Sequence, residues 1–182
     1  MQITTKQILR VLLIIAWIIF VGLGIEAGGY TWNTIYPLVT TPYESWEFWN
    51  HTDLSSLYNA DKGQFAVIGF FISLTFILKA ILFYLIIRLL QEDNLNMLRP
   101  FTRATVNFLL NVSYLSIAIS FFSGWGVRWT ESLVARGFTL PTIDKLNLDG
   151  SDVWSFMGVT MFVIAQVFKR GIEIQTENEL TI

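Results

Sequence analysis

The stretch VLLIIAWIIFVGLGI, residues 11–25, decides the fold, because none of its side chains is charged or strongly polar. The apolar segment around it runs from about residue 8 to residue 29, and a transmembrane helix needs about 20 such residues. The segment is longer than the hydrophobic region of a signal peptide, and no small-x-small cleavage site is evident. We therefore predict a membrane-spanning helix that the mature protein keeps.

The composition agrees with a membrane protein. Of the 182 residues, 53% are hydrophobic, 15% are aromatic and 14% are charged, whereas a soluble domain has about 25% charged residues. So little polar surface predicts that lipid covers much of the molecule. The net charge of −2 argues against direct nucleic-acid binding. The absence of cysteine excludes disulfides, thiolate metal sites and thiol catalysis.

Three further segments are long and apolar enough to cross a bilayer. They lie at about residues 64–90, 103–124 and 152–170. The sequence therefore predicts an all-α, polytopic membrane protein with four transmembrane helices in a bundle and a single domain over residues 1–182. The remaining segments are loops at 30–63, 91–102 and 125–151 and a tail at 171–182.

Positive charge orients these helices, because loops that carry an excess of Lys and Arg stay in the cytoplasm. Seven cations lie on the side of both termini and the 91–102 loop: Lys6, Arg10, Arg88, Arg99, Arg103, Lys169 and Arg170. Four lie on the other side: Lys62, Arg128, Arg136 and Lys145. We therefore expect cytoplasmic termini, a cytoplasmic 91–102 loop and two long outer loops.

Lys79 lies inside the second predicted span, in LTFILKAILFY. It comes nine residues before Arg88, so about 13 Å of helix separates it from the predicted cytoplasmic boundary. A charge at that depth costs about 3 kcal/mol on insertion scales, so polar partners are expected. The polar side chains predicted at a similar depth are Asn107, Asn111, Tyr114 and Thr160.

Two hypotheses for this intramembrane polar cluster stay open. In the structural one, Lys79 donates to the amides and hydroxyls or extends towards the cytoplasm, and the cluster fixes helix register. In the functional one, Lys79 binds an anion or relays protons. The structural hypothesis is favoured, because no carboxylate is predicted at that depth.

Glu26 is the only acid inside a predicted span. We expect it near the outer end of the first helix, about 10 Å or more from Lys79 along the membrane normal. Gly24 and Gly28 around it have the spacing that lets a neighbouring helix approach closely. We interpret the GIEAG segment mainly as a packing site, and Glu26 could also line a cavity.

The first outer loop holds aromatic and acidic side chains in YPLVTTPYESWEFWN, residues 36–50. A segment that lies on the bilayer interface is the favoured interpretation, and a rim of aromatics around an external ligand pocket is the alternative. His51 is the only histidine, with Glu44 and Glu47 as the nearest candidate metal ligands. Solvated loop residues explain these side chains better than a metal site does.

The sequence contains no Gly-rich phosphate loop and no nucleophile elbow. We therefore expect no catalytic residue, no metal and no cofactor, and a protein that is not an enzyme. The tail has too few apolar side chains to form a core, so we expect an acidic segment that does not fold alone.

The C-terminal stretch FKRGIEIQTENELTI and the stretch RPFTRATVNFLLNVSYL resemble the YoaS-like bacterial membrane proteins, a family of unknown function. The matching tail residues are Lys169, Arg170, Glu173, Glu177, Asn178, Glu179, Leu180 and Thr181. A Pro-Phe-Thr motif at the start of the third helix matches at Pro100, Phe101 and Thr102. The resemblance covers about the C-terminal half and the four-helix plan.

This resemblance implies a multi-pass protein of the bacterial inner membrane and brings no known activity. It also implies a partner, because genes of that family often neighbour a small helix-turn-helix regulator. We expect a non-enzymatic protein that acts in the lipid bilayer through interactions, as a sensor or tether for such a cytoplasmic regulator. A small transporter, channel component or immunity protein that uses the polar cluster is the alternative, and a homo-oligomer is left open.

Overall fold

The computed structural model describes residues 5–40, 52–91 and 102–179. Within these ranges the chain forms four long helices and one short one: α1 (Thr5–Val39), α2 (Ser55–Ala60), α3 (Lys62–Gln91), α4 (Arg103–Ala135) and α5 (Ser151–Glu179). The four long helices are each long and apolar enough to cross a membrane. The predicted all-α class with four membrane-spanning helices is therefore confirmed.

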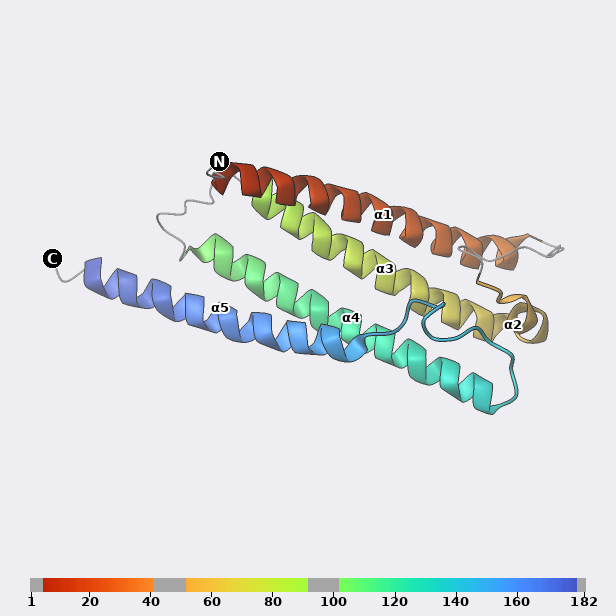
Figure 1. Cartoon of the computed structure of the whole chain (residues 1–182). Coiled ribbons are helices and arrows are strands. Elements are labelled where there is room, and N and C mark those ends of the chain that lie inside the picture. The colour runs from red at the N-terminus through yellow and green to blue at the C-terminus, as the bar shows by residue number, and fades with distance from the viewer. Residues whose placement is uncertain (1–4, 41–51, 92–101, 180–182) are drawn as a thin grey trace.

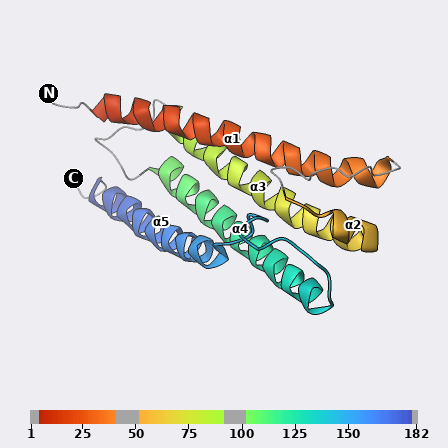
Figure 2. The same cartoon turned by 45° about the vertical axis from the view of Figure 1, so that its right-hand side comes forward.

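The four long helices form an open bundle (Figure 1). α3 and α4 pack against each other in the middle, α1 packs on α3, and α5 packs on α4. The start of α1 and the end of α5 lie at the same end of the bundle, and the turned view in Figure 2 shows the same arrangement. We call this the terminal end and the opposite one the α2 end.

The helices are longer than hydropathy alone predicted. α1 ends at Val39 rather than near residue 29, α4 at Ala135 rather than near residue 124, and α5 at Glu179 rather than near residue 170. The additional turns of α1 and α4 are less apolar, but they bury selected side chains such as Tyr30 and Leu133. Tertiary contacts therefore stabilise helix beyond the predicted membrane spans.

A hydrophobic core lies at the α2 end. It joins buried side chains of α1, α2, α3, α4 and the segment 136–150: Tyr30, Leu54, Leu57, Phe65, Ile68, Leu133, Leu146 and Leu148. Ser56 Oγ donates to the carbonyl oxygen of Thr139 at 2.7 Å, and Tyr58 OH donates to that of Pro37 at 2.7 Å. The segment 136–150 is therefore an ordered, packed connection.

Local capping fixes where the helices begin. Asp61 Oδ1 accepts from the backbone N–H groups of Gly63 and Gln64, at 2.8 and 3.0 Å, and so caps α3. Thr102 Oγ1 accepts from the N–H of Thr105 at 3.1 Å and caps α4. Before α2, Asp53 accepts from the N–H and hydroxyl of Ser55, and these hydrogen bonds lower the pKa of the Asp53 carboxyl.

The prediction of close helix packing at Gly24 and Gly28 is wrong within this chain. A Cβ at either position would meet nothing within 4 Å. The close approaches occur instead at Gly69, where a Cβ would clash with Thr34, and at Gly158, where it would lie 2.7 Å from Cγ1 of Ile117. Small residues therefore bring helices together at the α1–α3 and α4–α5 contacts.

Candidate functional site

Lys79 on α3 lies beside aromatic rings. Its Nζ is 5.4 Å from the ring centroid of Phe76 and 5.8 Å from that of Trp154 on α5. Both distances fall within the range of cation–π attraction. The acid whose charge acts on Lys79 is Asp149, in the segment before α5. Lys79 is therefore a half-buried cation that two rings and a nearby carboxylate stabilise.

The structure does not bring the five residues of the predicted polar cluster together. Within the described ranges, Lys79 has neither a hydrogen bond nor an ion pair with any of the other four. Asn107 and Asn111 line a hollow nearer the terminal end, Tyr114 is 57% exposed, and Thr160 is half-buried on α5. A functional role for the cluster stays a prediction.

The contact with Trp154 also sets the depth of Lys79. Trp154 lies in the first turn of α5, whereas α4 continues past this level to Ala135. The chain returns to the start of α5 through the non-helical segment 136–150, in which Asp144 and Lys145 are exposed. Non-helical backbone does not face lipid, so we expect a membrane around these helices to end near the start of α5. Lys79 would then lie close to that boundary.

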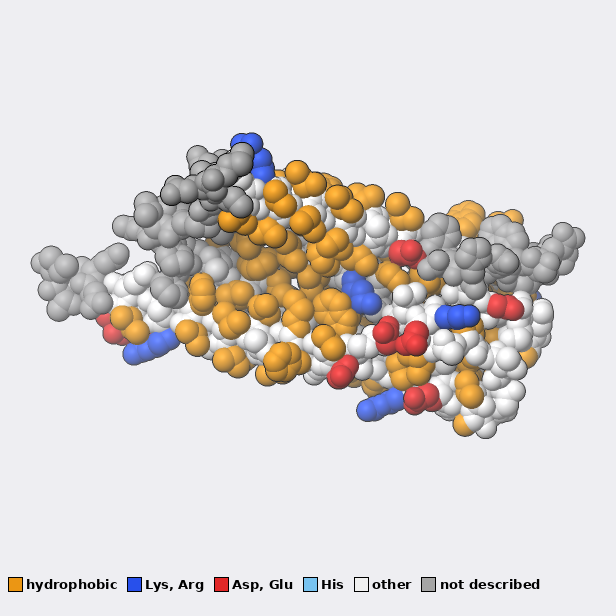
Figure 3. Space-filling model, viewed as in Figure 1, with side chains coloured by type: hydrophobic (Ala, Val, Ile, Leu, Met, Phe, Trp, Pro, Cys, Tyr) orange, Lys and Arg blue, Asp and Glu red, His pale blue; other side chains and the backbone are white. Residues whose placement is uncertain are grey.

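The surface agrees with this placement. In Figure 3, hydrophobic side chains cover the middle of the visible face, and many of the charged side chains in this view lie in the half towards the α2 end. The depth estimated from Arg88 placed Lys79 well inside the membrane. That estimate did not take into account that α5 begins part of the way along α4.

Glu26 lies at the level of Lys79, contrary to the expected separation. Phe20 of α1 contacts Tyr84 of α3 with 6.1 Å between ring centroids, and Tyr30 stacks on Phe76 at 5.1 Å. Glu26 falls between Phe20 and Tyr30, so it is level with the part of α3 between Phe76 and Tyr84. The prediction was wrong because α1 does not end near residue 29, so Glu26 is not near its end.

The structure shows a row of hydroxyl side chains on α4, which we call the α4 hydroxyl row. It was not identified from the sequence as a packing feature. Ser113 Oγ donates to the carbonyl oxygen of Gly158 at 2.8 Å, and Ser120 Oγ donates to that of Ser151 at 2.6 Å. Ser123 Oγ donates to the carbonyl oxygen of Leu148. The signal was the spacing of Ser113, Ser116, Ser120 and Ser123, three and four residues apart, which places them on one helix face.

A hollow of about 210 Å³ lies between α3 and α4 towards the terminal end. Its described lining combines polar and apolar side chains: Leu85, Arg88, Leu89, Ala104, Asn107, Phe108 and Asn111. Asn107 lies one helical turn, about 6 Å, from Arg103, the first residue of α4. The hollow therefore lies close to the terminal end of the membrane span.

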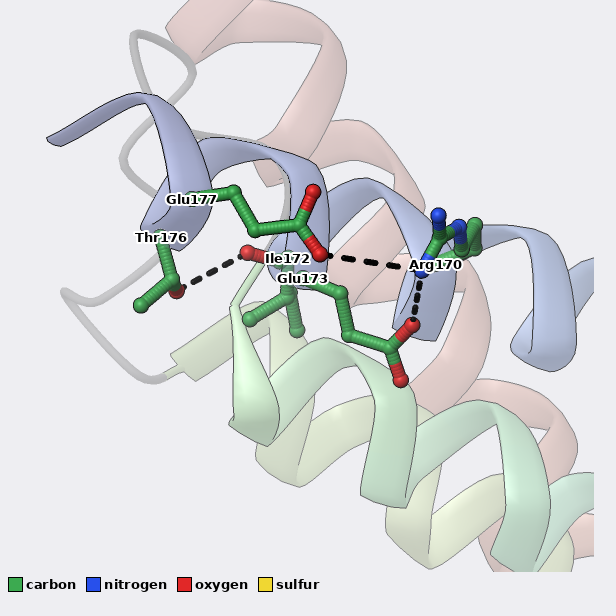
Figure 4. Close-up of polar contacts among 5 residues, drawn as sticks. All are labelled: Arg170, Ile172, Glu173, Thr176 and Glu177. Carbon is green, nitrogen blue, oxygen red and sulfur yellow. Dashed lines mark hydrogen bonds and ion pairs between the residues drawn. The ribbon is translucent and has the colours of Figure 1, made fainter. Parts of the chain in front are cut away.

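The tail contains an ordered helical part, shown in Figure 4. α5 continues through Gly171 to Glu179, so residues 171–179 of the predicted tail are helical as a continuation of α5. Arg170 Nη1 is 2.8 Å from Oε2 of Glu173 and 4.0 Å from Oε1 of Glu177. Asn178 and Glu179 belong to the helix, whereas Leu180 and Thr181 lie outside the described residues.

No group of three or more metal-binding side chains occurs in the described part of the chain. The candidate ligands Glu44, Glu47 and His51 lie outside that part, as does most of the aromatic segment of the first outer loop. The expectations of no metal, no cofactor and no catalytic residue therefore stay predictions.

Four long apolar helices in the described residues define a multi-pass membrane protein of four-helix type. Residues 49–182 match the family described as "Protein of unknown function (DUF2975)", and the chain belongs to this family. No curated protein and no solved structure matches the chain. α1 lies outside the matched residues, and the narrower YoaS-like resemblance stays a prediction.

Proposed function

We propose that this protein is a non-enzymatic protein of the bacterial inner membrane that binds a cytoplasmic partner through the end of α5. The partner implied by the resemblance is a small helix-turn-helix regulator, for which the protein would act as a membrane tether or sensor. The observation that carries the proposal is the ordered extension of α5 at residues 171–179, called here the α5 extension, in which residues 173–177 are exposed.

The α5 extension projects beyond its neighbour α4. The Ser113–Gly158 and Ser120–Ser151 hydrogen bonds pair α4 and α5 in antiparallel register. Arg103, the first residue of α4, is therefore level with Phe168. Glu179, the last residue of the extension, then lies about 16 Å past the start of α4, and the helix end stands clear of α4 in Figure 1. A preformed helix binds a partner at a lower entropic cost than an unfolded tail does.

The charges of the α5 extension favour a basic partner. Glu173 and Glu177 lie four residues apart, so they share one helix face, and both are exposed. The excess of Lys and Arg on the terminal side supports a cytoplasmic location. DNA-binding regulators carry basic surfaces, so such a regulator is complementary in charge to this acidic face.

Co-purification from the native host in mild detergent tests the proposal. The full-length protein should retain a stoichiometric soluble partner, and the double variant Glu173→Gln with Glu177→Gln should lose it. The matched control is Glu131→Gln with Asp144→Asn, which removes the same net charge from exposed positions towards the α2 end. Equal loss of the partner in both double variants, or retention in both, would contradict the proposal.

The alternative of a small transporter or channel component receives less support. It depends on Lys79 and the predicted polar cluster, whose members do not meet in the structure. Solute flux into liposomes that Lys79→Met abolishes would favour this alternative over the tether.

A further inference from the structure

We propose that the hollow between α3 and α4 binds the phosphate group of an anionic phospholipid. This inference goes beyond the proposed function and does not depend on the α5 extension. It rests on three features of the hollow: the chemistry of its lining, its position along the bundle, and its size.

The lining suits an amphiphile with an anionic head. Arg88 supplies a guanidinium, which recognises phosphate through paired hydrogen bonds. Asn107 and Asn111 lie one turn apart on α4 and supply amide donors for the remaining phosphate or glycerol oxygens. Leu85, Leu89 and Phe108 supply the apolar surface against which an acyl chain can pack.

The position of the hollow matches a lipid head at the terminal end. Arg88 shares the hollow with Asn107, which lies one turn from the first residue of α4. A long Arg side chain reaches towards the headgroups from about that depth. Basic pockets between transmembrane helices on the cytoplasmic side are places where anionic lipid heads bind, and the sequence predicts that this end is cytoplasmic.

The size of the hollow favours a compact head over a larger soluble ligand. Its volume of about 210 Å³ is below the roughly 300–1,000 Å³ of typical small-molecule sites. A phosphate with part of its glycerol needs less room, and the acyl chains remain in the surrounding lipid. Free phosphate has the same recognition chemistry, so the test must separate the two sources.

The test measures lipid binding to the full-length protein in mild detergent by native mass spectrometry. Phosphatidylglycerol should bind more tightly than phosphatidylcholine of the same chain length. Arg88→Gln should lower the affinity for phosphatidylglycerol by about tenfold, because it removes a charge-assisted contact. Lys169→Gln, which removes a cation at the same end but outside the hollow, should change this affinity by less than about twofold.

Two further variants test whether a loss of lipid binding comes from a folding defect. Arg88→Lys keeps the charge and should keep the preference for phosphatidylglycerol. Asn111→Leu keeps every charge and should weaken phosphatidylglycerol binding by about threefold through the loss of one amide contact. Equal binding of both lipids to the unmodified protein would overturn the proposal. So would displacement of phosphatidylglycerol by inorganic phosphate, because free phosphate would then be the ligand.

Discussion

At the scale of single residues, Lys79 shows how the structure changes the chemistry inferred from a sequence. The sequence predicted amide and hydroxyl partners at the same depth as Lys79. The structure gives it the rings of Phe76 and Trp154 and the charge of Asp149 instead. An ammonium at the membrane boundary can keep part of its hydration, so the cost expected for a deeply buried charge is smaller here.

A pair of double-mutant cycles tests these neighbours. Lys79→Met combined with Trp154→Leu should show a coupling free energy of about 0.5–1 kcal/mol, as expected for a partly exposed cation–π pair. Lys79→Met combined with Asn111→Leu should be additive within about 0.5 kcal/mol, because the two residues do not touch. The measurement is the free energy of unfolding in detergent. Strong coupling only in the second cycle would restore the predicted cluster.

At the scale of helices, the contact between α4 and α5 depends on small side chains and hydroxyls. Gly158 lets α5 approach so closely that a Cβ there would lie 3.2 Å from the carbonyl oxygen of Ser113. Ser113 in turn donates to the carbonyl oxygen of Gly158. The hydrogen bonds of the α4 hydroxyl row set the register between these two helices.

Substitution of glycine by alanine tests this contact. Gly158→Ala should destabilise the protein by about 1–3 kcal/mol, because the added methyl overpacks the contact with Ile117 and the Ser113 backbone. The matched control is Gly24→Ala on α1, where a Cβ meets nothing within 4 Å. That variant should be neutral or stabilise by up to about 1 kcal/mol. The free energy of unfolding in detergent checks both, and the reverse order would show that α1 is packed there.

At the scale of the whole molecule, the lengths of the four long helices and their antiparallel packing determine which parts face water. α1 begins and α5 ends at the same end, as four crossings require. The α2 end carries the hydrophobic core around Tyr30 and Phe65, the segment 136–150 and the additional turns of α1 and α4. We therefore expect this part to stand outside the hydrocarbon layer.

Labelling with an impermeant maleimide on intact cells tests this topology, since the chain has no cysteine of its own. Asp144→Cys and Arg128→Cys should react, because both positions lie towards the α2 end. Thr176→Cys on the α5 extension should react only after lysis. Val163→Cys, on the exposed apolar face of α5, should stay unlabelled in membranes in either case. Reaction of Thr176→Cys before lysis would reverse the orientation.

The sequence by itself determined the class of protein and the number of crossings. Hydropathy is a local property, and about 20 apolar residues favour a spanning helix whatever lies beside them. Three features were not set by local hydropathy: the polar ends of the helices, the neighbours of Lys79 and the level of Glu26. These features depend on which helices are neighbours and on the register between them. Gly69, Gly158 and the α4 hydroxyl row fix the neighbours and the register, and they do so only when the helices are in contact. Only the tertiary structure could therefore place Trp154 beside Lys79 and Glu26 at the level of Lys79, because each feature depends on the position of one helix relative to another.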